Sequence, residues 1–186
     1  MRITARINRR IIGATSLAAA AILLPTAALA SSAATNSASA VARPAATCTA
    51  SATRLWYGIP GEGTAGSVYY QIELSNIGHS TCSFFGYPGV SALDIHGHQV
   101  GRAATHGGGR VSATLSPGGT AHFVLRVVDA GAICAHPVKA SALKVFGPGQ
   151  FSAQIIGFAS EGCPGRSVLS VDSVHPGTGI PGYTNK

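Results

Sequence analysis

The sequence predicts an all-β domain, an antiparallel two-sheet sandwich of about nine strands. Three observations support this fold class. Apolar and polar residues alternate with a period of two in several segments, whereas the 3.6-residue period of an amphipathic helix does not recur. Gly and Pro residues separate these segments, and only 10% of the residues are charged. No segment reads as a helix long enough to connect parallel strands.

The strongest strand signal covers residues 66–75. Its residues fall into an apolar set and a mostly polar set that alternate: Val68, Tyr70, Ile72 and Leu74 against Ser67, Tyr69, Gln71, Glu73 and Ser75. Because successive side chains of a strand point to opposite faces, the apolar set is expected to enter a core. The remaining predicted strands cover residues 53–57, 82–85, 90–95, 110–115, 122–127, 143–146, 151–158 and 168–174.

Residues 1–30 read as a cleavable signal peptide. Four arginines precede an uncharged run at residues 11–24, and Ala28-Leu29-Ala30 supplies the small-x-small pattern that a signal peptidase recognises. We expect cleavage after Ala30, by way of either the general secretory or the twin-arginine route. As a helix the run would rise only about 21 Å, too short for a hydrocarbon core of roughly 30 Å. No transmembrane segment is therefore expected in the mature chain.

The rest of the chain divides by composition into three parts. Residues 31–47, rich in Ala, Ser and Thr, are predicted to be a flexible spacer, residues 48–176 a single β-sandwich domain, and residues 177–186 a disordered tail. Removal of residues 1–30 would leave nine of the 13 basic residues and all six acidic ones, a net charge of +3. Because the remaining basic residues are scattered, no nucleic acid is expected as a partner.

All four cysteines, Cys48, Cys82, Cys134 and Cys163, lie inside the predicted domain. An even number of cysteines in an exported chain indicates disulfides, and four cysteines allow three pairings. We favour Cys48 with Cys82 and Cys134 with Cys163, because each pair closes a loop of about 30 residues that would contribute roughly 3.5 kcal/mol. The gaps are too long for a zinc site, which places cysteines two to four residues apart.

Several motifs of the domain are similar to those of a known family. They are the strand start Ala65-Gly66-Ser67-Val68-Tyr69, the turn Leu74-Ser75-Asn76-Ile77-Gly78, the sequence Gly86-Tyr87-Pro88-Gly89-Val90 after Cys82, and Leu115-Ser116-Pro117-Gly118-Gly119. With these motifs the chain resembles the family called domain of unknown function 4232, found in secreted and lipid-anchored actinobacterial proteins. The resemblance implies an immunoglobulin-like sandwich in the cell envelope or the medium, and it implies no activity.

Histidines are the candidates for a metal site. His96 and His98 flank Gly97 and would share a face if they continued a strand, and His79 and His106 are predicted at loop tips. We favour a simpler interpretation, in which Asp94 to His98 is a hairpin turn with solvated histidines. No metal and no cofactor is therefore expected.

No catalytic motif is present in the sequence. It contains no Gly-x-Ser-x-Gly motif, and its six acidic residues, Glu62, Glu73, Asp94, Asp129, Glu161 and Asp172, are dispersed. We therefore expect a protein that is not an enzyme. The alternative is a small secreted hydrolase whose site assembles from loops.

Aromatic residues are the candidates for ligand binding. Trp56, Tyr57, Tyr69, Phe84, Phe85 and Tyr87 would either form a stacking surface for a glycan or peptide or fill the core. We expect Trp56 and Phe84 in the core. Tyr69 lies on the polar face of its strand and fits a binding face. The sequence thus favours a secreted, non-catalytic binding module for an unidentified envelope or extracellular protein or glycan.

Overall fold

The computed structural model describes residues 44–57 and 61–180, and in these ranges the chain is all-β, as predicted. It contains fourteen strands and two short 3-10 helices, η1 (Ala50–Ala52) and η2 (Ala130–Ala132). The predicted signal peptide, residues 31–43 of the predicted spacer and residues 181–186 of the predicted tail lie outside the described residues. No helix in the described part is long and apolar enough to cross a membrane.

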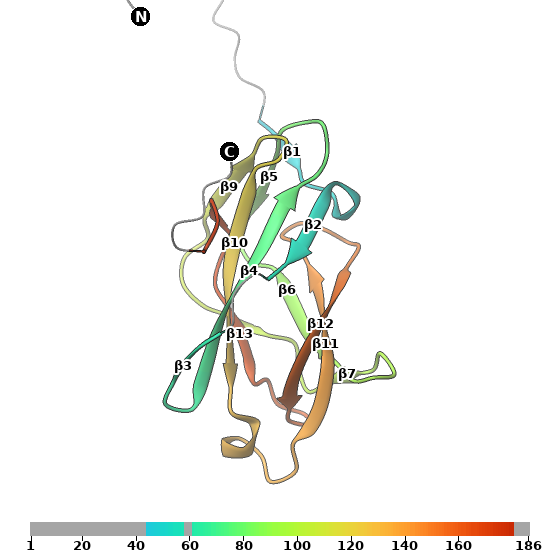
Figure 1. Cartoon of the computed structure of the whole chain (residues 1–186), viewed down its shortest axis with the longest axis vertical. Coiled ribbons are helices and arrows are strands. Elements are labelled where there is room, and N and C mark those ends of the chain that lie inside the picture. The colour runs from blue at the N-terminus through green and yellow to red at the C-terminus, as the bar shows by residue number, and fades with distance from the viewer. Residues whose placement is uncertain (1–43, 58–60, 181–186) are drawn as a thin grey trace, which may run out of the picture. The chain divides into compact units, whose positions relative to one another are not determined.

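The largest of the three sheets, sheet B, is built around the two long strands β4 and β10, which lie side by side in Figure 1. Its strand order is β2-β4-β10-β13-β8, with β3 paired to β4 and β14 paired to β10. The bounds are β2 (Thr53–Trp56), β3 (Glu62–Thr64), β4 (Ser67–Asn76), β8 (Thr105–His106), β10 (Thr120–Val128), β13 (Leu169–Val171) and β14 (His175–Pro176).

Two smaller sheets complete the fold. Sheet C has the order β12-β11-β6-β7, and sheet A has the order β1-β5-β9. Their bounds are β1 (Ala46–Thr47), β5 (Cys82–Phe85), β6 (Gly89–Leu93), β7 (Gln99–Val100), β9 (Ser112–Leu115), β11 (Val138–Phe146) and β12 (Gln154–Gly162). Figure 1 shows β11 and β12 as a second pair of adjacent long strands.

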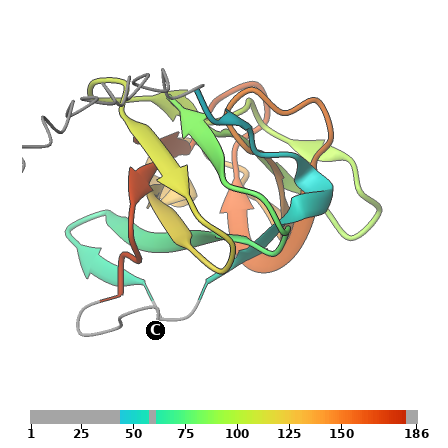
Figure 2. The ribbon, with the colours of Figure 1, turned by 90° about the horizontal axis from the view of Figure 1, so that it is seen from above.

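One hydrophobic core receives side chains from all three sheets, for example Ile72 and Phe123 from sheet B, Leu143 from sheet C and Phe84 from sheet A. These four side chains are fully buried. Their neighbours along each strand point outward, as the period of two requires. Figure 2 shows the same strands from above.

The chain passes from sheet A to sheet C at Gly86-Tyr87-Pro88. Gly86 has a φ of +94°, which side chains with a Cβ rarely adopt, and Pro88 has no N–H to donate to a ladder. β5 therefore stops at Phe85, and β6 begins in another sheet. This break explains why the structure has three hydrogen-bonded sheets instead of the two predicted.

The structure corrects several details of the predicted fold. Each of the nine predicted segments overlaps a strand, although several bounds differ; the segment at 151–158, for example, corresponds to β12 at Gln154–Gly162. Five further strands of two or three residues were not predicted: β1, β3, β7, β8 and β14. Two pairings, β1 with β5 and β13 with β8, are parallel, so the sheets are not purely antiparallel. These short strands have too few residues to show an alternation of apolar and polar side chains. They form because a longer strand pairs with them.

Both ends of the domain extend further than predicted. Ala46 and Thr47, assigned to the spacer, pair with Cys82 and Ser83 of β5. Residues 177–180, assigned to the disordered tail, are fastened to sheet B, since Gly177 donates its N–H to the carbonyl of Thr120 at 2.9 Å.

The two disulfides join Cys48 to Cys82 and Cys134 to Cys163, the pairing that the loop lengths favour. Cys48 and Cys163 are almost fully buried and belong to the core cluster. The first disulfide fastens the start of the domain to β5, and the second joins the end of β12 to the segment after η2.

Candidate ligand-binding face

A hollow of about 280 Å³ lies on the outer face of sheet B. We call it the outer hollow. Its lining combines one aromatic ring, two charged side chains and small or aliphatic residues: Tyr69, Gly107, Val124, Arg126, Ser170, Val171 and Asp172. Tyr69, which the sequence assigned to a binding face, is 38% exposed here.

Strand register brings these side chains together. Arg126 of β10 lies directly opposite Tyr69 of β4 on one side and opposite Ser170 of β13 on the other. Directly opposed residues of antiparallel strands point to the same face of the sheet. The three side chains therefore form a row across the outer face.

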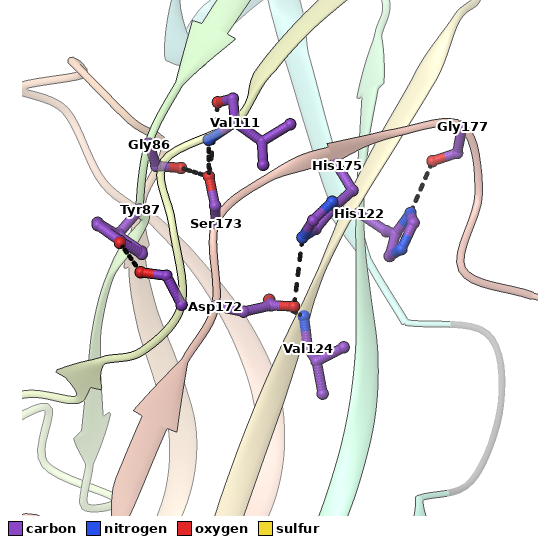
Figure 3. Close-up of polar contacts among 10 residues, drawn as sticks. Gly86, Tyr87, Val111, His122, Val124, Asp172, Ser173, His175 and Gly177 are labelled. Atoms are coloured by element: carbon purple, nitrogen blue, oxygen red, sulfur yellow. Dashed lines mark hydrogen bonds and ion pairs between the residues drawn. The ribbon is translucent and has the colours of Figure 1, made fainter.

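Hydrogen bonds fix the charged members of the hollow. The guanidinium Nε of Arg126 donates to Ser67 Oγ at 3.1 Å. Asp172 Oδ1 accepts the backbone N–H of Val124 at 2.6 Å, and its Oδ2 lies 3.5 Å from His175 Nε2 (Figure 3). These bonds hold the Asp172 carboxylate and the Arg126 guanidinium in place. The hollow therefore offers a hydrogen-bond acceptor and a donor that lose little conformational entropy when a ligand binds.

A row of three polar side chains, Glu73, His122 and His175, lies on the same face of sheet B as the hollow. Glu73 of β4 is opposite His122 of β10, which is in turn opposite His175 of β14. The rings of His122 and His175 stack with centroids 5.8 Å apart, and His122 Nδ1 is 2.9 Å from the carbonyl oxygen of Gly177 (Figure 3). The segment after β14 thus packs on the polar face of sheet B.

Glu73 is fully buried in this row. Its Oε1 accepts the N–H of Gly179 at 3.0 Å. Its Oε2, like the buried Oε1 of Gln71, has no hydrogen-bond partner among the described residues. Burial raises the pKa of Glu73, and the hydrogen bond from Gly179 and the charge of His122 oppose that rise. Within the row, Glu73 is therefore a buried carboxylate, whereas His122 and His175 remain partly exposed.

The other aromatic candidates lie either in the core or on the outer face, according to the alternation along each strand. Phe84 is buried in the core as predicted, and its neighbour Phe85 is 62% exposed. Tyr57 is exposed and packs edge-on against Phe158. The prediction for Trp56 is wrong: it is half-buried on the outer face of β2, because Leu55 occupies the core side, and its Nε1 donates to Ser75 Oγ at 2.9 Å.

The turn at Asp94–His98 is a hairpin turn with exposed histidines, as expected. Asp94 Oδ1 accepts the backbone N–H groups of both His96 and His98 at 2.8 Å. The backbone hydrogen bond from His98 is the main cause that lowers the pKa of Asp94. His79 is exposed, and His106 belongs to β8 instead of a loop tip. Within residues 44–57 and 61–180, no three His, Cys, Asp or Glu side chains form a group that could hold a metal ion.

Two carboxylates line a second cleft of about 360 Å³ between the ends of β4, β10 and β12. They are Asp129 and Glu161, and none of the described residues that line this cleft is basic. Asp129 Oδ1 accepts the N–H of Gly131 and so caps η2. In the described part of the chain, no serine hydroxyl is hydrogen-bonded to a histidine ring.

Sequence reasoning missed Arg126, Val124 and Asp172 as members of the hollow. The alternation at residues 122–127 placed Val124 and Arg126 on the face opposite Phe123, which is correct. What the alternation does not contain is the register that sets Arg126 against Tyr69. Only the pairing of β10 with β4 and β13 supplies it.

Comparison with known proteins gives one match. The sequence model of a family described as "Domain of unknown function (DUF4232)" matches residues 48–175. No curated protein and no solved structure matches the chain. All residues that line the outer hollow fall within the matched range.

Proposed function

The chain belongs to the family described as domain of unknown function DUF4232, and we propose that it is a non-catalytic binding module that works outside the cytoplasm. The two disulfides support this location, because such bonds persist in oxidising compartments. The pattern of residues 1–30 supports export. Intact mass of the protein recovered from culture medium tests it: a chain beginning at or near Ser31 is expected, and one that retains residues 2–10 contradicts export.

We also propose an immunoglobulin-like sandwich, in which sheets B and C face each other. Ile72 and Phe123 of sheet B and Leu143 and Val145 of sheet C belong to one buried cluster, which supports this arrangement. An experimental structure in which these two sheets do not pack face to face would contradict it.

The outer hollow is the observation that carries the binding proposal. The ring of Tyr69 offers a flat face for stacking, Arg126 donates hydrogen bonds and Asp172 accepts them. The hollow, about 280 Å³, is close to the lower limit of small-molecule sites, which is about 300 Å³. A protein partner would need a contact of about 800 Å² on each side. A single sugar unit of an envelope or extracellular glycan fits the hollow better than a protein surface does.

Calorimetric titration with glycan fragments tests this proposal. Tyr69→Ala is expected to weaken binding about tenfold, because the stacking face is lost. Tyr57→Ala is the matched control, since Tyr57 is similarly exposed at 42% but lies outside the hollow. Equal affinity of the Tyr69→Ala variant and the unchanged protein would contradict the proposed site.

The alternative of a small hydrolase is favoured by one observation, the shared cleft of Asp129 and Glu161. A glycosidase requires two carboxyl groups on either side of the bond that it cleaves. Asp129 also caps η2 through the bond from Gly131, so a structural role accounts for its position. If the protein released reducing sugar from a glycan and a Glu161→Gln variant did not, the proposal of a binding module would be wrong and the protein would be an enzyme.

A further inference from the structure

A second exposed surface, distinct from the outer hollow, is centred on Arg110. Its guanidinium carbon lies 6.0 Å from the ring centroids of both Phe85 and Tyr87. The side chain runs over Gly86, where a Cβ would come within 3.6 Å of Arg110 Cδ. Arg110 is exposed, and among the described residues no carboxylate lies within ion-pair distance of it.

The backbone beneath Arg110 is firmly held. The buried hydroxyl of Ser173 accepts the N–H of Val111 at 2.8 Å and donates to the carbonyl of Gly86 at 3.0 Å (Figure 3). Gly86 also donates its N–H to the carbonyl of Val111 at 3.0 Å. These bonds tie together the two segments that carry Arg110 and the aromatic rings.

The aromatic side of the surface is held as well. The ring of Tyr87 stacks on His106 with centroids 4.7 Å apart and an angle of 9° between the planes. The Tyr87 hydroxyl donates to the carbonyl of Gly108. Phe85, by contrast, leaves 62% of its surface exposed. The surface therefore combines an exposed guanidinium beside two aromatic rings with the open face of Phe85.

This combination has a definite chemical preference. A guanidinium has a planar set of donors that matches the two oxygens of a carboxylate, and stacking on aromatic rings leaves its edge free to donate. An exposed cation that has no carboxylate within ion-pair distance among the described residues attracts an anion. Phe85 in turn favours a ligand with an apolar flat face beside its charge.

We propose that the surface of Phe85, Tyr87, His106 and Arg110 binds an acidic saccharide. The carboxylate of the sugar accepts two hydrogen bonds from Arg110, and the C–H face of the same ring packs on Phe85. In a sugar whose carboxylate is attached directly to the ring, the carboxylate and the C–H face of the ring belong to one rigid unit. An acidic peptide carries its carboxylate on a flexible side chain and would lose more conformational entropy, so the rigid surface favours the saccharide.

Titration of the purified domain with digalacturonate, followed by calorimetry and by NMR of the arginine side chains, tests the proposal. Binding that moves the Arg110 signal, and that weakens as salt is added, is expected. Arg110→Gln is expected to weaken binding about tenfold or more, because it removes a charge-assisted pair of hydrogen bonds. Arg166→Gln, an exposed arginine elsewhere, is the control for charge, and Phe151→Ala is the control for Phe85→Ala.

Each arm of the experiment decides one part of the proposal. Equal affinity for the methyl ester of digalacturonate, or unchanged affinity of Arg110→Gln, would overturn the role of the carboxylate. Tighter binding of an oligoglutamate peptide would overturn the choice of a saccharide. Unchanged affinity of the Phe85→Ala variant would contradict the proposed packing of the sugar ring on Phe85. Tyr69→Ala must leave digalacturonate binding intact, which separates this surface from the outer hollow. Thermal unfolding of every variant verifies that it is folded.

Discussion

The carboxylate of Glu73 accepts a hydrogen bond from the backbone N–H of Gly179 across 106 residues of sequence. This bond fastens the last described segment of the chain to the middle of β4. The second carboxylate oxygen of Glu73 is buried and has no hydrogen-bond partner in residues 44–57 and 61–180. The bond from Gly179 therefore holds the segment in place but compensates the charge of Glu73 poorly.

Glu73→Gln is expected to make the protein more stable at neutral pH. Burial raises the pKa of Glu73 in the folded protein above the ordinary value of 4.5, which applies to the unfolded chain. Between the pKa of the unfolded chain and that of the folded protein, the folded protein therefore binds more protons. The free energy of unfolding therefore falls as pH rises through this window. The gain of the variant at pH 7 should disappear below about pH 4.5, where both forms are neutral.

Urea denaturation at pH 4 and pH 7 measures this difference. Glu62→Gln is the matched control, because Glu62 is exposed on β3, and its free energy of unfolding should follow that of the unchanged protein at both pH values. A Glu73→Gln variant that is less stable than the unchanged protein at pH 7 would mean that the charge itself stabilises the fold.

Two adjacent phenylalanines should lose very different amounts of stability on the same substitution. Phe84→Ala empties a fully buried position and is expected to cost about 3–5 kcal/mol of unfolding free energy. Phe85→Ala removes an exposed ring and should cost less than about 1 kcal/mol. Chemical denaturation of both variants checks the assignment, and similar losses would show that the strand does not present these faces.

The disulfides are expected to be Cys48–Cys82 and Cys134–Cys163 in the exported protein. Peptide mapping without reduction tests this, and a peptide that links Cys82 to Cys134 would contradict it. Replacement of Cys134 and Cys163 together by Ala should lower the free energy of unfolding by about 3–4 kcal/mol, since the bond closes a loop with a sequence separation of 29. Removal of either disulfide alone should leave the other intact.

The histidines of the β6–β7 turn are expected to bind transition metals only weakly. His96 and His98 supply at most two ligands, and Asp94 is engaged by both backbone N–H groups of the turn. Calorimetric titration of the chelator-treated domain with zinc and copper, beside a His96→Ala, His98→Ala double variant, measures this. Submicromolar affinity that the double variant loses would identify a metal protein.

Local pattern predicts those parts of the fold that depend on one strand at a time. The alternation at residues 66–75 is sufficient to place Ile72 and Leu74 in the core, and both are buried. For Trp56 the alternation gives no answer, because a strand of four residues is too short to show which of its two faces is apolar. Hydrophobicity alone then predicts, wrongly, that the largest side chain lies in the core. The structure places Leu55 inside and gives Trp56 a hydrogen-bond partner in Ser75.

The sequence by itself determined the all-β class, the nine main strands and the family, because these depend on the order and period of residues along the chain. The tertiary structure decided which strands lie side by side, and so which side chains meet. Tyr69 and Arg126, or Phe85 and Arg110, come together only through the register of paired strands and the break at Gly86. A shift of one residue in that register would turn every side chain to the other face, and no residue pattern within a single strand records it.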